Sequence, residues 1–588
     1  MCGMITAAMR AKDELLRLLP FAAAVGGGLV LRSAFPPFEG NGGAAFLAPV
    51  PIFVATRLLP PRKAAAAAFA GMLAFWTCAL SWFLPLVHNG GPWPLVLLGI
   101  VGLGAWCASF SALAAFALSR FRAPWRALRA EAVQVRRQLV EAPENSPEED
   151  AAAARLAAIR RRCGLWEALG PFAAAALWAG AECLRSRIGG GFSWYGLGSA
   201  VSGLPALRQL AALGGAPLVS AAVALLADAL AGVSLRAWDV VVHSPGSTRR
   251  HFDLTLALAA LLAAFWWGTA RIRAVRAAES AAPRSVRVAA VDPDLPCIFD
   301  GNAEEWDEAT ERLVGLTRAA AAARPDFVAW PETSLWEPMP SRRMEDGLAH
   351  FTAEIGAPVF AGATLLEGPG APPDAPVRNA YWLFGPDGAS RPYAKRHLVP
   401  FGEFIPLDEH VPFLRRFAPA GVTCTPGAAP ALFETAGVRI SPLVCFEDTD
   451  SPTARSAARR ADMLLSASND AWFEGSCESA QHHREASLRA IECGVPLLRV
   501  SNKGASGVVS PSGAETPDGG ALFVHTVPLP DRASLPPPPY ARHGDWLFGY
   551  PCAALLAALA AAPRRRRKAS RKAAPVSASR ISPESCAS

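Results

Sequence analysis

The sequence predicts two kinds of structure in one chain: a helical domain that crosses a membrane several times, and an α/β layered domain placed before a last crossing. Composition is the first observation. Of 588 residues, 52% are hydrophobic and only 18% are charged, whereas soluble proteins carry about 25% charged residues. Pattern is the second. Long apolar segments fill residues 1–271, whereas short apolar runs alternate with longer helical stretches over residues 284–535.

The N-terminal domain, residues 1–271, is predicted to hold seven membrane spans. Most of its apolar segments approach the ~20 residues that a helix needs to cross a bilayer. The second and seventh are short, and Pro49 and Pro51 interrupt the second. An eighth span is expected after a stiff proline-rich linker at 536–539. The eight predicted spans are 15–35, 43–59, 64–87, 93–119, 166–187, 211–235, 254–270 and 546–562.

The basic residues predict the orientation of these spans. Lys and Arg concentrate in the connections after the second, fourth and sixth spans, and cytoplasmic loops carry such an excess. With these loops in the cytoplasm, the basic tail 563–588 also lies there and the α/β domain lies outside. Arg185 and Arg187 fall on the opposite side and are exceptions.

The arginine run of the tail directly follows an apolar segment, so the net charge of +7 does not indicate a nucleic-acid partner.

Residues 122–162 form a charged insertion between the fourth and fifth spans. The insertion is rich in charge, alanine and glutamine, and Pro143 and Pro147 lie in its middle. We expect either two short cytoplasmic helices flanking a turn or a partly disordered spacer.

The domain over 284–535 is predicted to be an α/β layered domain. Its apolar runs indicate strands at 285–291, 326–330, 358–362, 380–384, 439–445, 463–467, 497–501, 506–510 and 522–526. Helices are expected at 303–324 and 480–493.

Three polar residues in this domain form a candidate catalytic set. Cys445 and Glu332 each end an apolar run, and Lys395 lies between them in the sequence. A thiol with a pKa near 8.5 is only a few per cent thiolate at pH 7. Glu332 can take the thiol proton if burial raises its own pKa. Lys395 can stabilise the thiolate and the oxyanion of a tetrahedral intermediate, so the set suits acyl transfer through a thioester.

Further carboxylates and an apolar loop surround this set. Glu403 and Glu447 could steer Lys395, relay a proton, or form structural salt bridges. The stretch after Lys395 carries apolar residues that belong either to the core or to a lid that touches lipid. The residues considered for that lid are Phe401, Phe404, Phe413 and Leu414.

No metal or disulfide framework is predicted. The twelve cysteines lack C-x-x-C pairs and zinc spacing, and we expect Cys445 to remain a free thiol. His482 and His483 are adjacent, which is a weak pattern for metal ligands. The glycine triplets 26–28 and 189–191 lack a following lysine and are expected at close packing or turns.

The motifs resemble those of the apolipoprotein N-acyltransferases, membrane-embedded members of the nitrilase (carbon-nitrogen hydrolase) superfamily. The resemblance covers nearly the whole chain. It is carried by 330–333 (WPET), 395–406 (KRHLVPFGEFIP), 444–447 (VCFE), 468–473 (SNDAWF), 481–482 (QH), 489–492 (RAIE), 499–502 (RVSN) and 542–545 (RHGD).

The resemblance implies a nitrilase-like α-β-β-α sandwich on the periplasmic side of a bacterial inner membrane. It implies Glu332 as general base, Lys395 as oxyanion stabiliser and Cys445 as nucleophile, with Glu403 and Glu447 assisting. It implies a ping-pong reaction in which Cys445 takes an acyl chain from a phospholipid, phosphatidylethanolamine, and passes it to the α-amine of a diacylglyceryl-cysteine lipoprotein. No metal or soluble cofactor is expected.

Two other functions fit the same residues. A membrane-tethered amidase of the nitrilase type would use water as the acceptor, and the three candidate residues do not distinguish it from an acyltransferase. An inactive scaffold that binds lipoproteins would leave the three intact catalytic positions unexplained.

Overall fold

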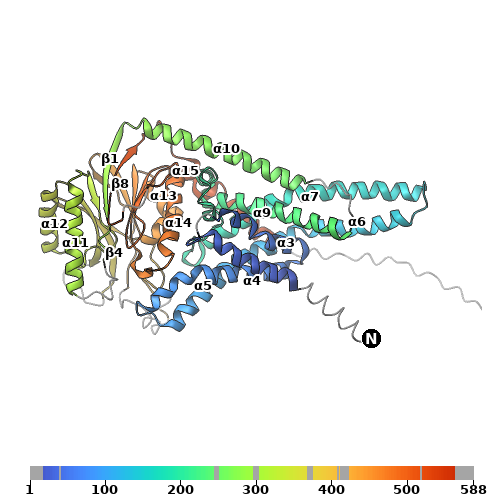
Figure 1. Ribbon diagram of the computed structural model, residues 1–588, viewed down its shortest axis with the longest axis horizontal. Coiled ribbons are helices and arrows are strands. Elements are labelled where there is room, and N and C mark those ends of the chain that lie inside the picture. Colours follow the sequence, from blue (N-terminus) through green and yellow to red (C-terminus); the bar gives the residue numbers. More distant parts are fainter. Residues whose placement is uncertain are drawn as a thin grey trace, which may run out of the picture.

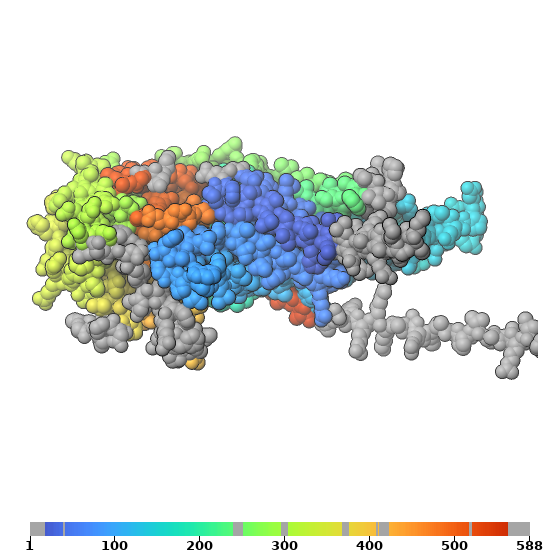
Figure 2. Space-filling model, turned by 60° about the horizontal axis from the view of Figure 1, so that its bottom comes forward, coloured from blue at the N-terminus to red at the C-terminus, as the bar shows by residue number. Residues whose placement is uncertain are grey.

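A computed structural model describes residues 18–38, 41–243, 251–295, 303–366, 375–406, 410, 423–516 and 520–562. The molecule is elongated (Figure 1). The α/β domain forms one end, a bundle of long helices follows it, and a helical hairpin projects from the far end of the bundle. The space-filling view shows the blue N-terminal helices and the α/β domain as one continuous surface (Figure 2).

Five of the eight predicted spans coincide with helical segments that are long and apolar enough to cross a membrane. These segments are Pro61–Val87 (α4, Pro61–Ala79, with η2, Leu80–Val87), Trp93–Phe121 (α5), Ala211–Trp238 (in α9, Ala211–His243), Phe252–Ser280 (α10) and Pro539–Ala561 (α15, Pro539–His543, η8, Gly544–Trp546, and α16, Gly549–Ala561). The first two predicted spans match shorter apolar helices, Leu18–Ala34 and Gly42–Leu58. The total of eight spans stays a prediction.

The second predicted span breaks where its prolines lie. Helix α2 (Gly42–Leu47) ends before Pro49, and α3 (Val50–Leu58) has Pro51 in its first turn, where the missing amide hydrogen is tolerated.

Close packing explains one glycine of the first triplet, 26–28. A Cβ atom on Gly28 would overlap the carbonyl oxygen of Gly71 in α4. The helix that carries Gly28 can therefore pack this closely against α4 only because residue 28 is glycine.

A buried ion cluster joins the helices at the end of the bundle far from the α/β domain. Arg57 and Arg122 both contact the carboxylate of Asp228, which is fully buried, and Arg236 pairs with Asp253. Charges inside a helical membrane domain are stable only when paired. The cluster therefore ties α3, α9 and the start of α10 together.

The insertion is a helical hairpin. Helix α6 (Ala123–Glu141) packs against the first half of α7 (Pro147–Arg185) through Leu128, Val135, Leu156 and Ile159. The side chain of Ser146 caps the start of α7 by accepting from the amide of Glu149. The expectation of two short helices is wrong for the second one. Helix α7 runs on into the predicted fifth span, past Gly164 and Pro171.

The α/β domain has two sheets packed face to face between two layers of helices. One sheet has the strand order β12-β1-β2-β3-β4-β5, with β6 paired to β4, and the other has the order β11-β10-β9-β8-β7. The first sheet contains β1 (Arg284–Val291), β2 (Phe327–Ala329), β3 (Val359–Leu366), β4 (Val377–Gly385), β5 (Gly388–Ala389), β6 (Tyr393–Ala394) and β12 (Leu522–Leu529). The second contains β7 (Phe433–Thr435), β8 (Val438–Val444), β9 (Met463–Asn469), β10 (Leu497–Asn502) and β11 (Gly507–Val509).

Each sheet buries its outer face under its own helices. Helices α11 (Ala303–Ala321) and α12 (Arg342–Ile355) cover the first sheet, and α13 (Ser451–Ala458) and α14 (Glu478–Cys493) cover the second (Figure 1). Apolar residues of both sheets form one shared core between them. These four layers confirm the predicted α-β-β-α sandwich.

The side of the α/β domain that holds the second sheet and its covering helices faces the helical bundle. Helix α14 and α15 contact α9, and η7 (Asp470–Phe473) contacts η2. The carboxyl ends of β8 and β9, which carry candidate functional residues, therefore lie close to the bundle. This arrangement brings the candidate residues of the α/β domain next to the helical bundle.

Candidate active site

Cys445 lies at the tip of β8, where the chain turns sharply into the short helical turn η6 (Cys445–Thr449). Its φ angle is +51°, a left-handed conformation that non-glycine residues rarely adopt and that clusters at functional sites. The sharp turn places the thiol at the end of a buried parallel strand, as the sequence predicted.

Glu332 lies just after β2 in the other sheet, and its carboxylate is held by three donors. One oxygen, Oε1, accepts from the Asn379 amide at 2.7 Å and lies 3.4 Å from the Lys395 ammonium. The other, Oε2, accepts from the backbone amide of Asn469 at 3.0 Å. Because Asn469 ends β9 in the second sheet, this bond joins the two sheets at the site.

Lys395 follows the two-residue strand β6, and its side chain is buried between two carboxylates. The Nζ atom lies 3.0 Å from Glu403 Oε1 and 3.4 Å from Glu332 Oε1. The Lys395 amide also donates to the Asn379 carbonyl at 2.8 Å. The ammonium is therefore fixed from both its backbone and its side chain.

Burial and mutual charge set the protonation of these groups. Burial raises the pKa of Glu332 above its ordinary range, although Lys395 opposes this effect. Burial also raises the pKa of the Cys445 thiol to about 12, with a further contribution from the charge of Glu332. Burial alone would lower the pKa of Lys395, but Glu403 and Glu332 raise it well above the ordinary value. These shifts favour the neutral thiol of Cys445 and the charged ammonium of Lys395.

Asn379 is a site residue that the sequence reasoning missed. Its amide nitrogen donates to Glu332 at 2.7 Å and to Glu403 at 2.8 Å. One side chain therefore holds in place both of the carboxylates that contact Lys395. The only signal in the sequence is a polar residue within the apolar run of β4.

The two carboxylates predicted to assist, Glu403 and Glu447, have different surroundings. Glu403 contacts Lys395 directly, and its other oxygen accepts from the Val399 amide at 2.8 Å. Glu447 is fully buried and accepts from the backbone amides of Val444, Arg396 and His397 at 2.7–3.1 Å. It also accepts from the Tyr393 hydroxyl. Glu447 therefore links the Cys445 turn to the segment after Lys395.

Replacing Glu447 with glutamine is expected to destabilise the fold near the site. The amide nitrogen of glutamine would face backbone donors, and each buried donor left unpaired costs about 1–3 kcal/mol. The melting temperature in detergent should fall, whereas Glu434→Gln, a matched change at an exposed position of strand β7, should leave it unchanged. An unchanged melting temperature with lost activity would instead indicate a chemical role for Glu447.

The lid candidates are only partly described. The side chain of Phe401 is 61% exposed and its φ angle is +65°, and Phe404 is half-buried. Phe413 and Leu414 lie outside the described residues. The exposure of Phe401 fits a lipid-contacting loop, but the choice between lid and core stays open.

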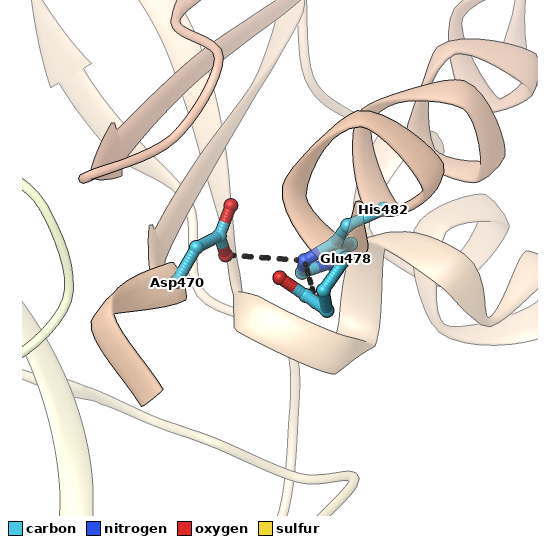
Figure 3. Close-up of side chains that lie close together, drawn as sticks. All are labelled: Asp470, Glu478 and His482. Atoms are coloured by element: carbon cyan, nitrogen blue, oxygen red, sulfur yellow. Dashed lines mark hydrogen bonds and ion pairs between the residues drawn. The ribbon is translucent and has the colours of Figure 1, made fainter. Parts of the chain in front are cut away.

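A second cluster of charges lies behind the Cys445 turn. Figure 3 shows Asp470 and Glu478 pointing toward the ring of His482, at 3.3 and 3.4 Å from Nδ1. The other ring nitrogen, Nε2, lies 2.9 Å from Asp448. Arg499 completes the cluster, with Nη2 at 3.0 Å from Asp470.

These groups are close enough to hold a metal ion, and they also pair with one another within the protein. Burial alone would lower the pKa of His482, yet Asp448 and Asp470 raise it well above the ordinary value. The guanidinium of Arg499 pairs with Asp470 on the other side. The cluster is therefore best described as a buried ion network that supports the turn after Cys445.

Nine cysteines among the described residues are free, and Cys445 is one of them. Cys424 lies near the same charged groups, because its amide donates to the Glu403 carbonyl at 2.8 Å. Burial raises the pKa of Cys424 to about 12 as well. The thiol pKa alone therefore does not distinguish Cys424 from Cys445. Their positions in the fold distinguish them.

Comparison with known proteins identifies both domains. The model of the apolipoprotein N-acyltransferase N-terminal domain matches residues 27–137 and 151–229, which leaves out the tip of the α6–α7 hairpin. The model of the carbon-nitrogen hydrolase family matches residues 287–520.

Full-length relatives agree with these matches. The apolipoprotein N-acyltransferase of Gloeobacter violaceus is 30% identical over 568 residues, covering 91% of this chain and 92% of that protein. That of Sinorhizobium medicae is 32% identical over 374 residues, covering 61% of this chain and 67% of its own. Among solved structures, an amidase from Nesterenkonia sp. covers 42% of this chain and 90% of its own, with 18% identity and a TM-score of 0.31. The chain therefore belongs to the apolipoprotein N-acyltransferase family of membrane-embedded acyltransferases.

Proposed function

We propose that this enzyme moves a fatty acyl chain from a membrane phospholipid to Cys445, and then to the N-terminal α-amine of a diacylglyceryl-cysteine lipoprotein. The observation that supports this proposal most is the buried pair of Glu332 and Lys395. The pair lies near the end of the strand that carries Cys445, on the side of the α/β domain that contacts the helical bundle. Phosphatidylethanolamine is the proposed donor. No cofactor enters the reaction.

The first half-reaction forms a thioester. Glu332 accepts the thiol proton as the sulfur attacks the ester carbonyl of the phospholipid, because a thiol with a raised pKa is not ionised beforehand. Lys395 stabilises the oxyanion of the tetrahedral intermediate. The carbon–oxygen bond to the glycerol then breaks, and the proton on Glu332 passes to the departing lysophospholipid.

The second half-reaction forms the amide. The lipoprotein amine attacks the thioester carbonyl, and Glu332 removes a proton from that amine. Collapse of the intermediate releases the cysteine sulfur, which recovers its proton. Glu403 keeps Lys395 in place through both steps, and Glu447 holds the two active-site segments together. Phe401 and Phe404 are the described candidates for lipid contact.

The topology supports a periplasmic site on a bacterial inner membrane. The arginine-rich hairpin lies at one end of the bundle and the α/β domain at the other (Figure 1), and basic segments favour the cytoplasm. We propose a membrane domain at 1–271 with its insertion at 122–162, a catalytic domain at 284–535, a last span at 546–562 and a cytoplasmic tail at 563–588. Both lipid substrates then lie in the membrane that holds the enzyme.

Mass analysis of the detergent-purified enzyme tests this proposal. After incubation with phosphatidylethanolamine, the intact mass should rise by one acyl chain, and hydroxylamine should remove it as it does a thioester. Peptide mapping should place the adduct on Cys445, and a diacylglyceryl-cysteine peptide should discharge it with formation of an amide. Rapid discharge by water alone would favour the amidase alternative. No adduct with any phospholipid, and no cleavage of simple amides, would favour a scaffold.

A further inference from the structure

Arg187, like Arg185, is an exception to the charge pattern of the membrane-domain loops. It lies on the side of the bundle that carries the α/β domain, where Arg32 and Arg208 also contact that domain. It follows the last residue of α7 by two positions, at the junction with the α/β domain. A charge retained at this position needs a local explanation.

Two aspartates from distant parts of the chain bind this guanidinium. Arg187 Nη1 lies 3.4 Å from Asp450 Oδ1, and Nη2 bonds to Asp545 Oδ2. The side chains of Asp450 and Asp545 are 12% and 3% exposed, and that of Arg187 is 23% exposed. Pairs this well buried are screened little by solvent. Arg187 thus joins the end of α7 to two other segments.

Asp450 belongs to the turn that presents Cys445. It lies directly after η6 and caps α13 by accepting from the Thr453 amide at 3.0 Å. Thr449, the residue before Asp450, is also held by hydrogen bonds. The Thr449 carbonyl accepts from Ser193 Oγ at 2.9 Å and from Arg489 Nη1 at 2.8 Å. The turn is therefore attached to the junction, which contributes Arg187 and Ser193, at successive positions.

The segment after Lys395 is attached at the same place. The ring of His397 lies 3.0 Å from the Gly190 carbonyl through Nε2, and its Nδ1 lies 3.7 Å from Asp450 Oδ2. Asp450 is thus shared by Arg187 and His397. Asp545, the other partner of Arg187, lies in η8, the turn that leads into α16. It belongs to the RHGD motif, which the proposed chemistry does not use.

We propose that Arg187 is a positioning residue that fixes the Cys445 turn, the Lys395 segment and the start of the last membrane helix relative to one another. The membrane domain would then set the place of the thiol and ammonium with respect to the lipid surface. This inference rests on the proposed function for its activity readout, but its central measurement does not.

The central measurement is the rate at which iodoacetamide alkylates Cys445, followed by peptide mass in the full-length enzyme. The Arg187→Gln variant should be alkylated at a rate that differs several-fold from that of the native enzyme, because the Cys445 turn is no longer held at the junction. Arg187→Lys should restore most of the native rate, since one ammonium can still reach an aspartate. Arg160→Gln, which changes an exposed arginine in the first half of α7, should match the native protein.

Kinetics of N-acylation give the second readout. Misplacement of reacting groups by about 1 Å can lower a rate 100-fold, so Arg187→Gln should lower kcat about 10- to 100-fold with little change in KM. Asp545→Asn, which keeps a hydrogen-bond acceptor but loses the charge, should act in the same direction if Arg187→Gln fails to fold.

Three results would overturn the inference. The first is an alkylation rate for Arg187→Gln equal to that of Arg160→Gln. The second is an Arg187→Lys variant no better than Arg187→Gln. The third is a loss carried entirely by KM. If the native enzyme forms no acyl adduct but the alkylation rates follow the expected order, the proposed function fails while the positioning role stands.

Discussion

Replacing Cys445 with alanine is expected to abolish both the acyl adduct and N-acyl transfer. The side chain at the tip of β8 is the candidate nucleophile, and no other thiol lies at the end of a strand facing the Glu332–Lys395 pair in the described part of the chain. The loss should exceed the 10²–10⁴-fold effect typical of removing one acid–base group, because no covalent intermediate can form. Intact mass and release of lysophospholipid both report the result.

Cys424 provides the matched control for this experiment. It is a free thiol beside the same charged groups, and its pKa is raised to about 12 just as that of Cys445 is. Cys424→Ala should keep the adduct and the transfer activity. An adduct that persists in Cys445→Ala and disappears in Cys424→Ala would move the nucleophile to Cys424 and contradict the proposed mechanism.

The candidate catalytic residues could be found from sequence because each has a distinctive local context. Cys445 and Glu332 end apolar runs that form parallel strands, and the carboxyl ends of such strands meet at one edge of a layered fold. Lys395 follows a strand of only two residues, too short for periodicity to detect, and was found through its motif. Their packing against one another depends on contacts between the two sheets, which no local pattern contains.

Asn379 and Arg187 show where sequence reasoning stops. Asn379 lies inside β4, where its polarity contradicts the apolar pattern, but only the fold reveals that it faces two carboxylates. The charge pattern marks Arg187 as an exception, but its partners are more than 250 positions away in the sequence. The assisting roles of Glu403 and Glu447 could not be separated for the same reason.

The fold was predicted best where hydrophobic pattern alone determines structure. Each of the nine predicted strands overlaps a strand in the structure, because these largely buried strands have the sequence pattern of short apolar runs. Helices α12 and α13 were missed. Helix α13 is only eight residues long, and α12 carries many polar residues around one narrow apolar face. Helix α10 extends to Ser280, beyond the predicted span, because the charged residues after the apolar part are also good helix formers.

Replacing Glu332 with glutamine is expected to lower the rate of acyl-enzyme formation by about 10²–10⁴-fold at neutral pH. Glutamine keeps the size of the side chain and can still accept from Asn469, but it cannot take a proton from a thiol whose pKa is about 12. Binding of the phospholipid should change little. Stopped reactions analysed by intact mass give the rate, and Glu354→Gln, on the exposed outer face of α12, is the matched control.

The pH dependence distinguishes a base from a merely structural carboxylate. Native activity should fall as pH drops through the pKa of Glu332, and because burial raises that pKa the acidic limb should lie above the ordinary glutamate range. In Glu332→Gln this limb should disappear. Loss of the carboxylate charge also removes one cause of the raised thiol pKa, so the remaining activity should climb as alkaline pH ionises Cys445 directly. A variant that keeps the native pH profile at reduced amplitude would show that Glu332 organises the site without accepting the proton.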